Sequence, residues 1–319
     1  MSNLKIAVVG QGVIGLTSAI RLAEKGYSVD IFSKEKFTET TSMSAGAYWW
    51  PHKTYPEDRV SQWSKATFEQ YKLDATKTNS GVSFQEHYRY CLDPDDSKYV
   101  LNLVEEWKEI DGCDFGIPCH EAFKVVVPVI NVPVYMPRLK AQADKLGIGF
   151  FEKHIESPSQ LFSEYSLVIN CTGVDARHFA KDEEVYPIRG QVVRLSLPKG
   201  LKASSRIYQK EDKFTLVLPR ENDLVLGGTA QEGDWSREPQ ERDAKTIIER
   251  CSKLNPDIKK CEILGSGVGL RPGRKEVRLE IETIGQNKKI IHNYGHGGGG
   301  FTVAWGCADE VLKLANQEQ

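Results

Sequence analysis

The sequence predicts an α/β protein in which a Rossmann-like nucleotide-binding domain is interleaved with a mixed-sheet α+β domain. A strand, a glycine turn and a helix open the chain, and strands and helices typical of the same domain recur in its middle and near its end. The length of 319 residues corresponds to about two domains. Because no linker long enough to separate two consecutive domains occurs, each domain is expected to consist of discontinuous segments.

The N-terminal segment carries a dinucleotide-binding fingerprint. Residues 5–9 form an apolar run typical of a buried parallel strand, and GQGVIG then leads into a helical pattern that ends at Gly26. Gly10 permits a tight turn, Gly12 lets the backbone approach a pyrophosphate, and Gly15 lets helix and strand pack closely. Glu35 follows the next predicted strand. At this position of the fingerprint, an acidic side chain typically binds the adenosine ribose. This acid favours NAD or FAD over NADP, and the fingerprint alone leaves those two open.

The order of the predicted elements divides the chain into five alternating segments. Strands are predicted at 165–173, 190–197 and 223–229, and helices at 139–147 and 306–315. The nucleotide-binding domain is predicted to comprise residues 1–50, 139–184 and 265–319. The second domain, which would bind the substrate, is predicted to comprise residues 51–138 and 185–264.

Composition argues against several classes of partner and site. The net charge of −2, without a basic tail, predicts no binding to nucleic acid or to an anionic membrane. The longest apolar stretch, residues 125–136, contains Pro128 and Pro133 and is not expected to span a bilayer. The seven cysteines are scattered without a CxxC pair, which favours free thiols over a disulfide framework or a metal site. Because the N-terminal residues do not resemble a signal peptide, a cytoplasmic protein is predicted.

A glycine-rich segment, HNYGHGGGGFTVAWGCA at 292–308, lies near the C-terminus. Its composition is compatible with a flexible tail, a phosphate cradle or a wall against a flat ligand. Apolar residues alternate directly after the glycines, at Phe301, Val303 and Trp305, which argues against a tail. Residues 10–15 already supply a phosphate cradle. His292 and His296 are interpreted as packing or hydrogen-bonding residues.

Four stretches resemble the D-amino acid oxidase family of FAD-dependent enzymes, and their order matches along nearly the whole chain. They are residues 7–19 with 33–49, residues 168–177 with 185–195, VGLRPGRKEVRLE at 268–280, and residues 290–308. The resemblance implies that the first domain binds FAD. It also implies that the glycine-rich segment lies along the flavin, with backbone amides donating to the ring and no side chains to collide with it.

The same resemblance implies oxidative deamination of a D-amino acid. Hydride transfer from the α-carbon to flavin N5 would give a 2-oxo acid, ammonia and, after reaction with oxygen, hydrogen peroxide. The expected partners are therefore a small amino acid and molecular oxygen, and a homodimer is compatible with the resemblance. The C-terminal residues LKLANQEQ lack the peroxisomal signal of many eukaryotic relatives, which agrees with a cytoplasmic location.

The resemblance also implies roles for individual residues. Arg271 would clamp the substrate α-carboxylate as a bidentate pair, and the carbonyl of Gly298 would receive the substrate amine. His52, in a stretch like that of aspartate oxidases, would lie near the substrate side chain, and Tyr208 is the tyrosine that remains near the active-site loop. The residues implied in FAD binding are Gly10, Gly12, Val13, Ile14, Gly15, Glu35, Lys36, Thr40, Thr41, Ser44, Ala45, Gly46, Ile155, Cys171, Thr172, Gly173, Arg278, Gly297, Gly298, Gly300, Phe301 and Thr302.

The sequence departs from the family where the substrate would bind. Leu216 and Asp212, or a neighbour of Asp212, stand where tyrosines are expected, and Gly299 replaces a tyrosine inside the glycine cluster. Ala230 replaces the arginine that aspartate oxidases place against an acidic side chain. A neutral or cyclic D-amino acid is therefore favoured. A D-aspartate or D-glutamate oxidase, a flavin-binding relative without oxidase turnover and an NAD-linked dehydrogenase remain the alternatives.

Overall fold

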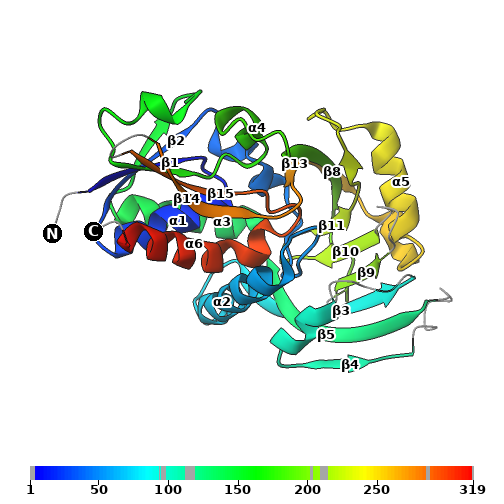
Figure 1. Cartoon of the computed structure of the whole chain (residues 1–319). Helices are drawn as coiled ribbons and strands as arrows, with labels where there is room; N and C mark the ends of the chain where they lie inside the picture. The colour runs from blue at the N-terminus through cyan, green and yellow to red at the C-terminus, as the bar shows by residue number, and fades with distance from the viewer. Residues whose placement is uncertain are drawn as a thin grey trace.

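A computed structural model describes residues 4–92, 94, 98–111, 119–201, 204–208, 215–284 and 288–317. Its strands form two sheets, which lie side by side and are connected by several crossings of the chain (Figure 1). The two sheets and the helices that cover them confirm the predicted α/β fold class.

The first sheet is built around β1. All its neighbouring strands pair in parallel except β14, which is antiparallel to β15. Helices α1 (Val13–Glu24), α3 (Val132–Lys145) and α6 (Gly300–Asn316) lie on one side of it (Figure 1). The strand order is β14 (Arg278–Thr283), β15 (Lys289–Tyr294), β7 (Leu167–Asn170), β1 (Lys5–Val9), β2 (Ser28–Ser33) and β6 (Gly149–Glu152).

The apolar run of β1 is buried on both faces of this sheet. Ile6 and Val8 belong to the core beneath the helices, whereas Ala7 and Val9 belong to a smaller core on the opposite face. Alternate residues of a strand point to opposite faces, so a strand covered on both sides needs continuous rather than alternating hydrophobicity. This burial explains why the first predicted strand is recognisable from five residues.

The second sheet is mixed, because β3 pairs in parallel with β9 while its other neighbouring pairs are antiparallel. Helix α5 (Glu241–Cys251) packs against β8, β10 and β11. The strand order is β12 (Gln231–Glu232), β8 (Tyr186–Leu195), β11 (Leu224–Gly227), β10 (Thr215–Pro219), β9 (Ser204–Tyr208), β3 (Val82–Cys91), β5 (Glu121–Ile130) and β4 (Trp107–Glu109), with β13 (Ile263–Gly273) also paired to β8.

The chain alternates between the two sheets, and this alternation supports the interleaved organisation expected from the sequence. Two elements lie differently from the predicted segments. β13 pairs with β8 along the second sheet, so the chain returns to the first sheet only at β14. Helix α2 (Glu57–Ala75) packs against α6, beside the first sheet (Figure 1). Among the described residues, no helix combines the length and apolar character that a membrane crossing needs.

Candidate cofactor and substrate site

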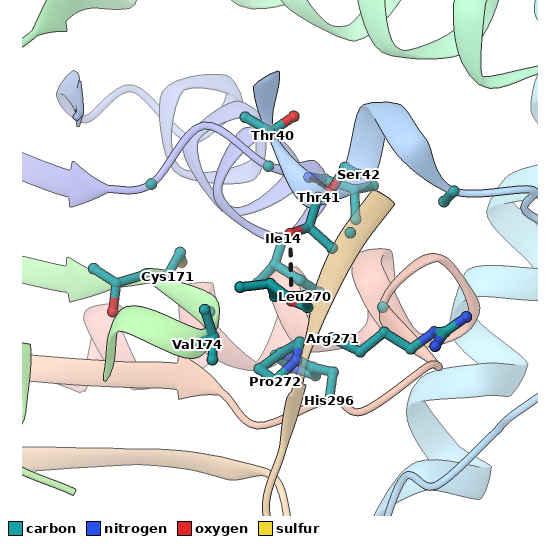
Figure 2. Close-up of a pocket in the computed structure, with 18 of the residues that line it drawn as sticks. Ile14, Thr40, Thr41, Ser42, Cys171, Val174, Leu270, Arg271, Pro272 and His296 are labelled. Carbon is teal, nitrogen blue, oxygen red and sulfur yellow. Dashed lines mark hydrogen bonds between the residues drawn. The ribbon is translucent and has the colours of Figure 1, made fainter. Parts of the chain in front are cut away.

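A cavity of about 580 Å³ is lined by residues at the carboxyl ends of β1, β2 and β7 and by residues of the second sheet. Open parallel sheets bind their ligands at this edge, and the volume lies within the roughly 300–1,000 Å³ of small-molecule sites. Figure 2 shows Ile14 and Thr41 beside β13, where the Thr41 hydroxyl donates to the carbonyl of Leu270 at 3.3 Å. The side chain of Arg271 extends from the same strand, away from Cys171 (Figure 2).

The turn after β1 depends on two close approaches of the backbone. Gly10 has a φ of 112°, and a Cβ there would lie 2.3 Å from the carbonyl oxygen of Cys171. A Cβ at Gly15 would lie 1.9 Å from the carbonyl oxygen of Gly10, so α1 can start this close to β1 only without a side chain. Gly15 therefore packs against the turn and does not line the cavity.

Two helix N-termini border the cavity. Gly12, Val13 and Ile14 line it at the start of α1, and Gly300 and Phe301 line it at the start of α6. Neither helix has a side-chain hydrogen bond from its N-cap residue. At the start of α1, the N–H of Val13 donates to Oγ of Ser42 at 2.9 Å. The N-terminus of a helix carries partial positive charge and N–H groups without an acceptor inside the helix, so both starts favour a ligand with negative charge.

Charged side chains gather in one part of the cavity, which we call the Glu35 group. Lys34 pairs with Asp175 at 2.6 Å, and Arg237 pairs with Glu35 at 2.5 Å. The Nε2 atom of Gln11 donates to the backbone oxygen of Glu35 at 2.6 Å. The group consists of Lys34, Glu35, Lys153, His154, Ile155, Glu156, Asp175 and Arg237.

A second set of lining residues, the Arg271 group, has a different character. It consists of Tyr48, Trp50, His52, Gly190, Val192, Leu216 and Arg271. The Arg271 guanidinium donates through Nη1 to the carbonyl of Thr229 at 2.9 Å. The guanidinium lies directly over Gly190 of the neighbouring strand β8. A Cβ at Gly190 would be 2.3 Å from Cζ of Arg271 and from both of its terminal nitrogens. The absence of a side chain at Gly190 thus makes room for Arg271.

The glycine-rich segment is in close contact with residues 52–54, through the backbone of Lys53 and the side chains of His52 and Thr54. A Cβ at Gly297 would lie 1.9 Å from the carbonyl oxygen of Lys53, and one at Gly298 would lie 2.7 Å from Cδ2 of His52. A Cβ at Gly299 would lie 2.2 Å from Oγ1 of Thr54. The protein itself therefore excludes side chains at all three positions, a reason that sequence reasoning did not identify.

Backbone hydrogen bonds also limit which amides of this segment can reach a ligand. The N–H of Gly297 donates to Pro272, that of Gly298 to His52, and that of Gly299 to His296, all at 2.8–2.9 Å. The next two residues, 300 and 301, form the first turn of α6, whose N–H groups have no acceptor within the helix. The amides that can donate into the cavity are thus those at the start of α6.

Two buried histidines and one buried cysteine in and near the cavity favour their neutral forms. Burial lowers the pKa of His296 to about 3, and its Nε2 atom lies 3.1 Å from the side-chain oxygen of Asn293. Burial also lowers the pKa of His292, whose Nε2 atom lies 2.9 Å from a carboxylate oxygen of Glu282. Burial raises the pKa of the Cys171 thiol to about 12. These shifts agree with packing and hydrogen-bonding roles for the histidines.

Most residues predicted from the sequence line the cavity together. They are Gly10, Gly12, Val13, Ile14, Glu35, Thr40, Thr41, Ser44, Ala45, Gly46, His52, Ile155, Cys171, Thr172, Gly173, Arg271, Gly297, Gly298, Gly300 and Phe301.

Other predicted residues lie elsewhere. Lys36 is exposed beside Glu35. Thr302 is buried and exchanges hydrogen bonds with the backbone of Trp50, so it supports a wall residue instead of forming the wall. Arg278 pairs with Glu280 and Glu282 and donates to the hydroxyl of Tyr294. Tyr208 ends β9, where only its backbone is described, and Asp212 lies outside the described residues.

Several lining residues were not predicted from the sequence. Gly190 follows the arginine of the IRGQ stretch, so a local signal for it existed. Tyr48 lies one residue before the tryptophan pair and was equally close to a recognised stretch. Arg237 had no local signal, because it lies between β12 and α5 of the second sheet and reaches Glu35 only in the folded chain.

Comparison with known proteins identifies the family. The model of a family described as FAD-dependent oxidoreductases matches residues 5–314. A D-amino-acid oxidase of Rubrobacter xylanophilus is 37% identical over 98% of this chain and 95% of its own length. A D-amino-acid oxidase of Dictyostelium discoideum is 35% identical over 99% of this chain and 92% of its own length. The chain belongs to the D-amino acid oxidase family of FAD-dependent oxidoreductases. This membership confirms the resemblance and the prediction of an FAD-dependent enzyme.

Two further comparisons concern a relative named for a different substrate and a solved structure. A D-aspartate oxidase of Homo sapiens is 30% identical over 99% of this chain and 96% of its own length. The crystal structure of glycine oxidase from Geobacillus kaustophilus superposes with a TM-score of 0.79 at 18% identity, covering 99% of this chain and 96% of that chain. The structural likeness shows a shared fold.

The cavity fits the cofactor of this family. FAD combines three parts with different needs. The ribose hydroxyls of its adenosine suit an acid, its anionic pyrophosphate suits backbone amides, and its flat ring suits a surface without side chains. The structure supplies Glu35, the N-terminus of α1 and the backbone at 297–300, all in one continuous cavity. Residues of this chain thus match each part of the cofactor.

Proposed function

We propose that this protein oxidises the α-amine of D-amino acids with neutral or cyclic side chains, giving a 2-oxo acid, ammonia and hydrogen peroxide. The observation that carries the proposal is the position of Arg271 beside the uncharged side chains of Tyr48, Trp50, Val192 and Leu216 in the wall of the cavity. The other lysine, arginine and carboxylate residues that line the described cavity belong to the Glu35 group. A guanidinium beside uncharged side chains suits a substrate with one carboxylate and an uncharged side chain.

The same proposal assigns the parts of the cavity to the parts of FAD. Glu35 and Ile155 would hold the adenosine, and the start of α1 would hold the pyrophosphate. The flavin would lie against residues 297–301, with donors from the N-terminus of α6 rather than from Gly297 and Gly298. When bound, FAD supplies the acceptor for the two electrons of the substrate and passes them to oxygen.

The residues of the Arg271 group would position the substrate. The planar guanidinium can donate to both oxygens of the α-carboxylate, which sets the direction of the α-carbon. The carbonyl of Gly298 would accept a hydrogen bond from the amine. No protein base is required at the α-carbon if the amine enters neutral, and the neutral state of His296 agrees with this scheme. Tyr48, Trp50 and Leu216 would exclude water from the side chain of the substrate.

An acidic D-amino acid is the second candidate. His52 lines the cavity, and a human D-aspartate oxidase is among the relatives. The buried residue Ala230, however, stands where an aspartate oxidase would place an arginine. A second carboxylate would therefore lack a cationic partner within the Arg271 group, and desolvating an unpaired carboxylate is costly.

A peroxide assay over a panel of amino acids tests the proposal. The flavin-loaded protein is expected to be yellow and to oxidise D-alanine, D-methionine or D-proline with a higher kcat/KM than D-aspartate, and to leave the L-enantiomers unchanged. Preference for D-aspartate would support the second candidate. Bound flavin without peroxide from any member of the panel would indicate a relative without oxidase turnover, and a colourless protein that binds NAD would indicate a dehydrogenase.

Location and assembly belong to the same proposal. A cytoplasmic protein is proposed because the described cysteines are free thiols, as is usual in a reducing compartment, and a homodimer because it is compatible with the family. Cell fractionation tests the location, and sedimentation of the flavin-loaded protein tests the assembly.

A further inference from the structure

The Glu35 group contains an ion pair that joins the two sheets across the cavity. Glu35 follows β2 of the first sheet, and Arg237 lies between β12 and α5 of the second. Their side chains pair at 2.5 Å, and both residues line the cavity. Their side chains are 22% and 40% exposed, so the pair lies at the rim of the cavity.

The backbone on both sides of Arg237 is held by a buried arginine of β8. Arg189 is fully buried and donates through Nε to the carbonyl of Ser236 at 3.1 Å and through Nη2 to the carbonyl of Glu238 at 2.7 Å. It pairs with Asp243 at 2.9 Å, which neutralises its charge inside the protein. Because these carbonyls flank residue 237, Arg189 fixes the position from which Arg237 extends.

Two further contacts hold the same loop. The side chain of Gln191 donates to the carbonyl of Gln240 and accepts from its N–H, both at 2.8 Å. On the other side, the ring of Trp235 lies 6.4 Å from the ring of His178, which lines the cavity beyond β7. The loop is thus anchored on β8 and reaches the rim of the first sheet at two residues.

We propose that Arg237 is a positioning residue for the cofactor, which holds the carboxylate of Glu35 ready for the adenosine ribose and closes the rim of the cavity there. A carboxylate has about four acceptor sites, so Glu35 can accept from Arg237 and from ribose hydroxyls at the same time. The pairing restricts the rotamers of Glu35 before the cofactor arrives. The proposal rests on the placement of adenosine at Glu35 proposed above.

Titration of the apoprotein with FAD tests this role. Arg237→Ala is expected to raise the dissociation constant about three- to tenfold, the range of a partly exposed, charge-assisted contact. Arg237→Lys should recover part of the loss, because the ammonium keeps the charge but lacks the planar fork. Arg242→Ala removes an exposed arginine of α5 that does not line the cavity, and should leave the dissociation constant unchanged.

A double-mutant cycle separates the role of Arg237 from the placement of adenosine. If Arg237 acts through Glu35, Arg237→Ala should add little to the loss caused by Glu35→Gln. A Glu35→Gln variant that binds FAD as tightly as the parent would refute the placement of the ribose. Weaker FAD binding by Glu35→Gln together with unchanged FAD binding by Arg237→Ala would refute only the role of Arg237. Tighter FAD binding by Arg237→Ala would also refute that role, because it would mean that the ion pair competes with the cofactor.

Discussion

The Glu35 group and the Arg271 group line one cavity but are constructed differently. At the nucleotide turn beside the Glu35 group, Gly10 and Gly15 lie within one short stretch. A Cβ at Gly15 would meet the carbonyl of Gly10, and one at Gly10 would meet the carbonyl of Cys171 after β7. In the Arg271 group, the guanidinium on β13 depends on Gly190 of β8, and the wall comes from β8, β10 and the segment after η2 (Thr41–Ser44). A short sequence pattern thus marks the proposed cofactor turn, whereas pairing between distant strands assembles the proposed substrate wall. Variants should therefore separate the two functions.

The largest effect is expected from removing the charge of the Arg271 group. Arg271→Leu leaves a substrate carboxylate without its partner, which costs about 3–5 kcal/mol for a buried charge pair. The kcat/KM for the best D-amino acid should fall about 100-fold or more, with flavin still bound. Arg271→Lys keeps the charge without the fork and should act mainly on KM. Unchanged kcat/KM in Arg271→Leu, measured by peroxide formation, would place the carboxylate clamp elsewhere.

A smaller effect on the same group is expected from Gly190→Ala. The new methyl group would occupy the position of the Arg271 guanidinium and displace the flexible end of that side chain without affecting the fold. The KM should rise about tenfold, since a shifted clamp loses roughly 1.4 kcal/mol of carboxylate binding. FAD affinity should stay the same. Gly267→Ala is the matched control, because its Cβ has no neighbour closer than 3.5 Å; equal kinetics in both variants would contradict the role of Gly190.

The glycine-rich segment allows a test that needs no cofactor. A Cβ at Gly298 would collide with His52, whereas one at Gly300 has no neighbour closer than 3.8 Å. Gly298→Ala should therefore lower the free energy of unfolding of the apoprotein by about 1–3 kcal/mol, as overpacking does. Gly300→Ala should leave it nearly unchanged. Urea unfolding of both apoproteins measures the difference, and equal stability would mean that only the flavin requires glycine at 298.

The comparison also shows how far the sequence allows prediction. The glycine turn, Glu35 and the glycine-rich segment could be predicted because each is a short local pattern with a backbone requirement. Arg271 could be predicted only through the family. Arg237 was missed because its partner Glu35 lies far away in the chain and becomes a neighbour only through the anchoring of the 231–240 loop by Arg189. Gly190 lies in a recognised stretch, but its role depends on the pairing of β8 with β13, which places Arg271 over it.

The same reason explains why the strand near residue 265 pairs with the second sheet, although the sequence analysis begins a nucleotide-binding segment there. The pattern GSGVGLRPG contains few continuous apolar residues, because β13 is buried against the cavity only over part of its length. Its assignment to the second sheet follows from hydrogen bonding to β8, which a single sequence does not reveal. Glycine and proline are depleted in strands, so local propensity did not indicate this strand, and tertiary pairing decided that it forms and which sheet it joins.

The smallest effect on activity is expected from His296, which lines the cavity beside the glycines. Its pKa is about 3 in the folded protein and near 6.5 in an unfolded chain, so the unfolded state binds the additional proton between those values. Stability should therefore increase with pH across that window and be lost as the pH falls below about 6.5. Between pH 7.5 and 5 this one group accounts for about 2 kcal/mol of the free energy of unfolding.

His296→Gln should remove that part of the pH dependence, because glutamine can still donate to Asn293 but does not titrate. Urea unfolding of the apoprotein at pH 5 and 7.5 gives the comparison with the parent protein. The kcat/KM profiles of the parent protein and of the variant should have the same shape between pH 5 and 8. A histidine that is neutral throughout this range contributes no titration to the active site. A step that is present in the parent protein and absent from the variant would make His296 an acid–base group of the active site and would contradict a site without a protein base.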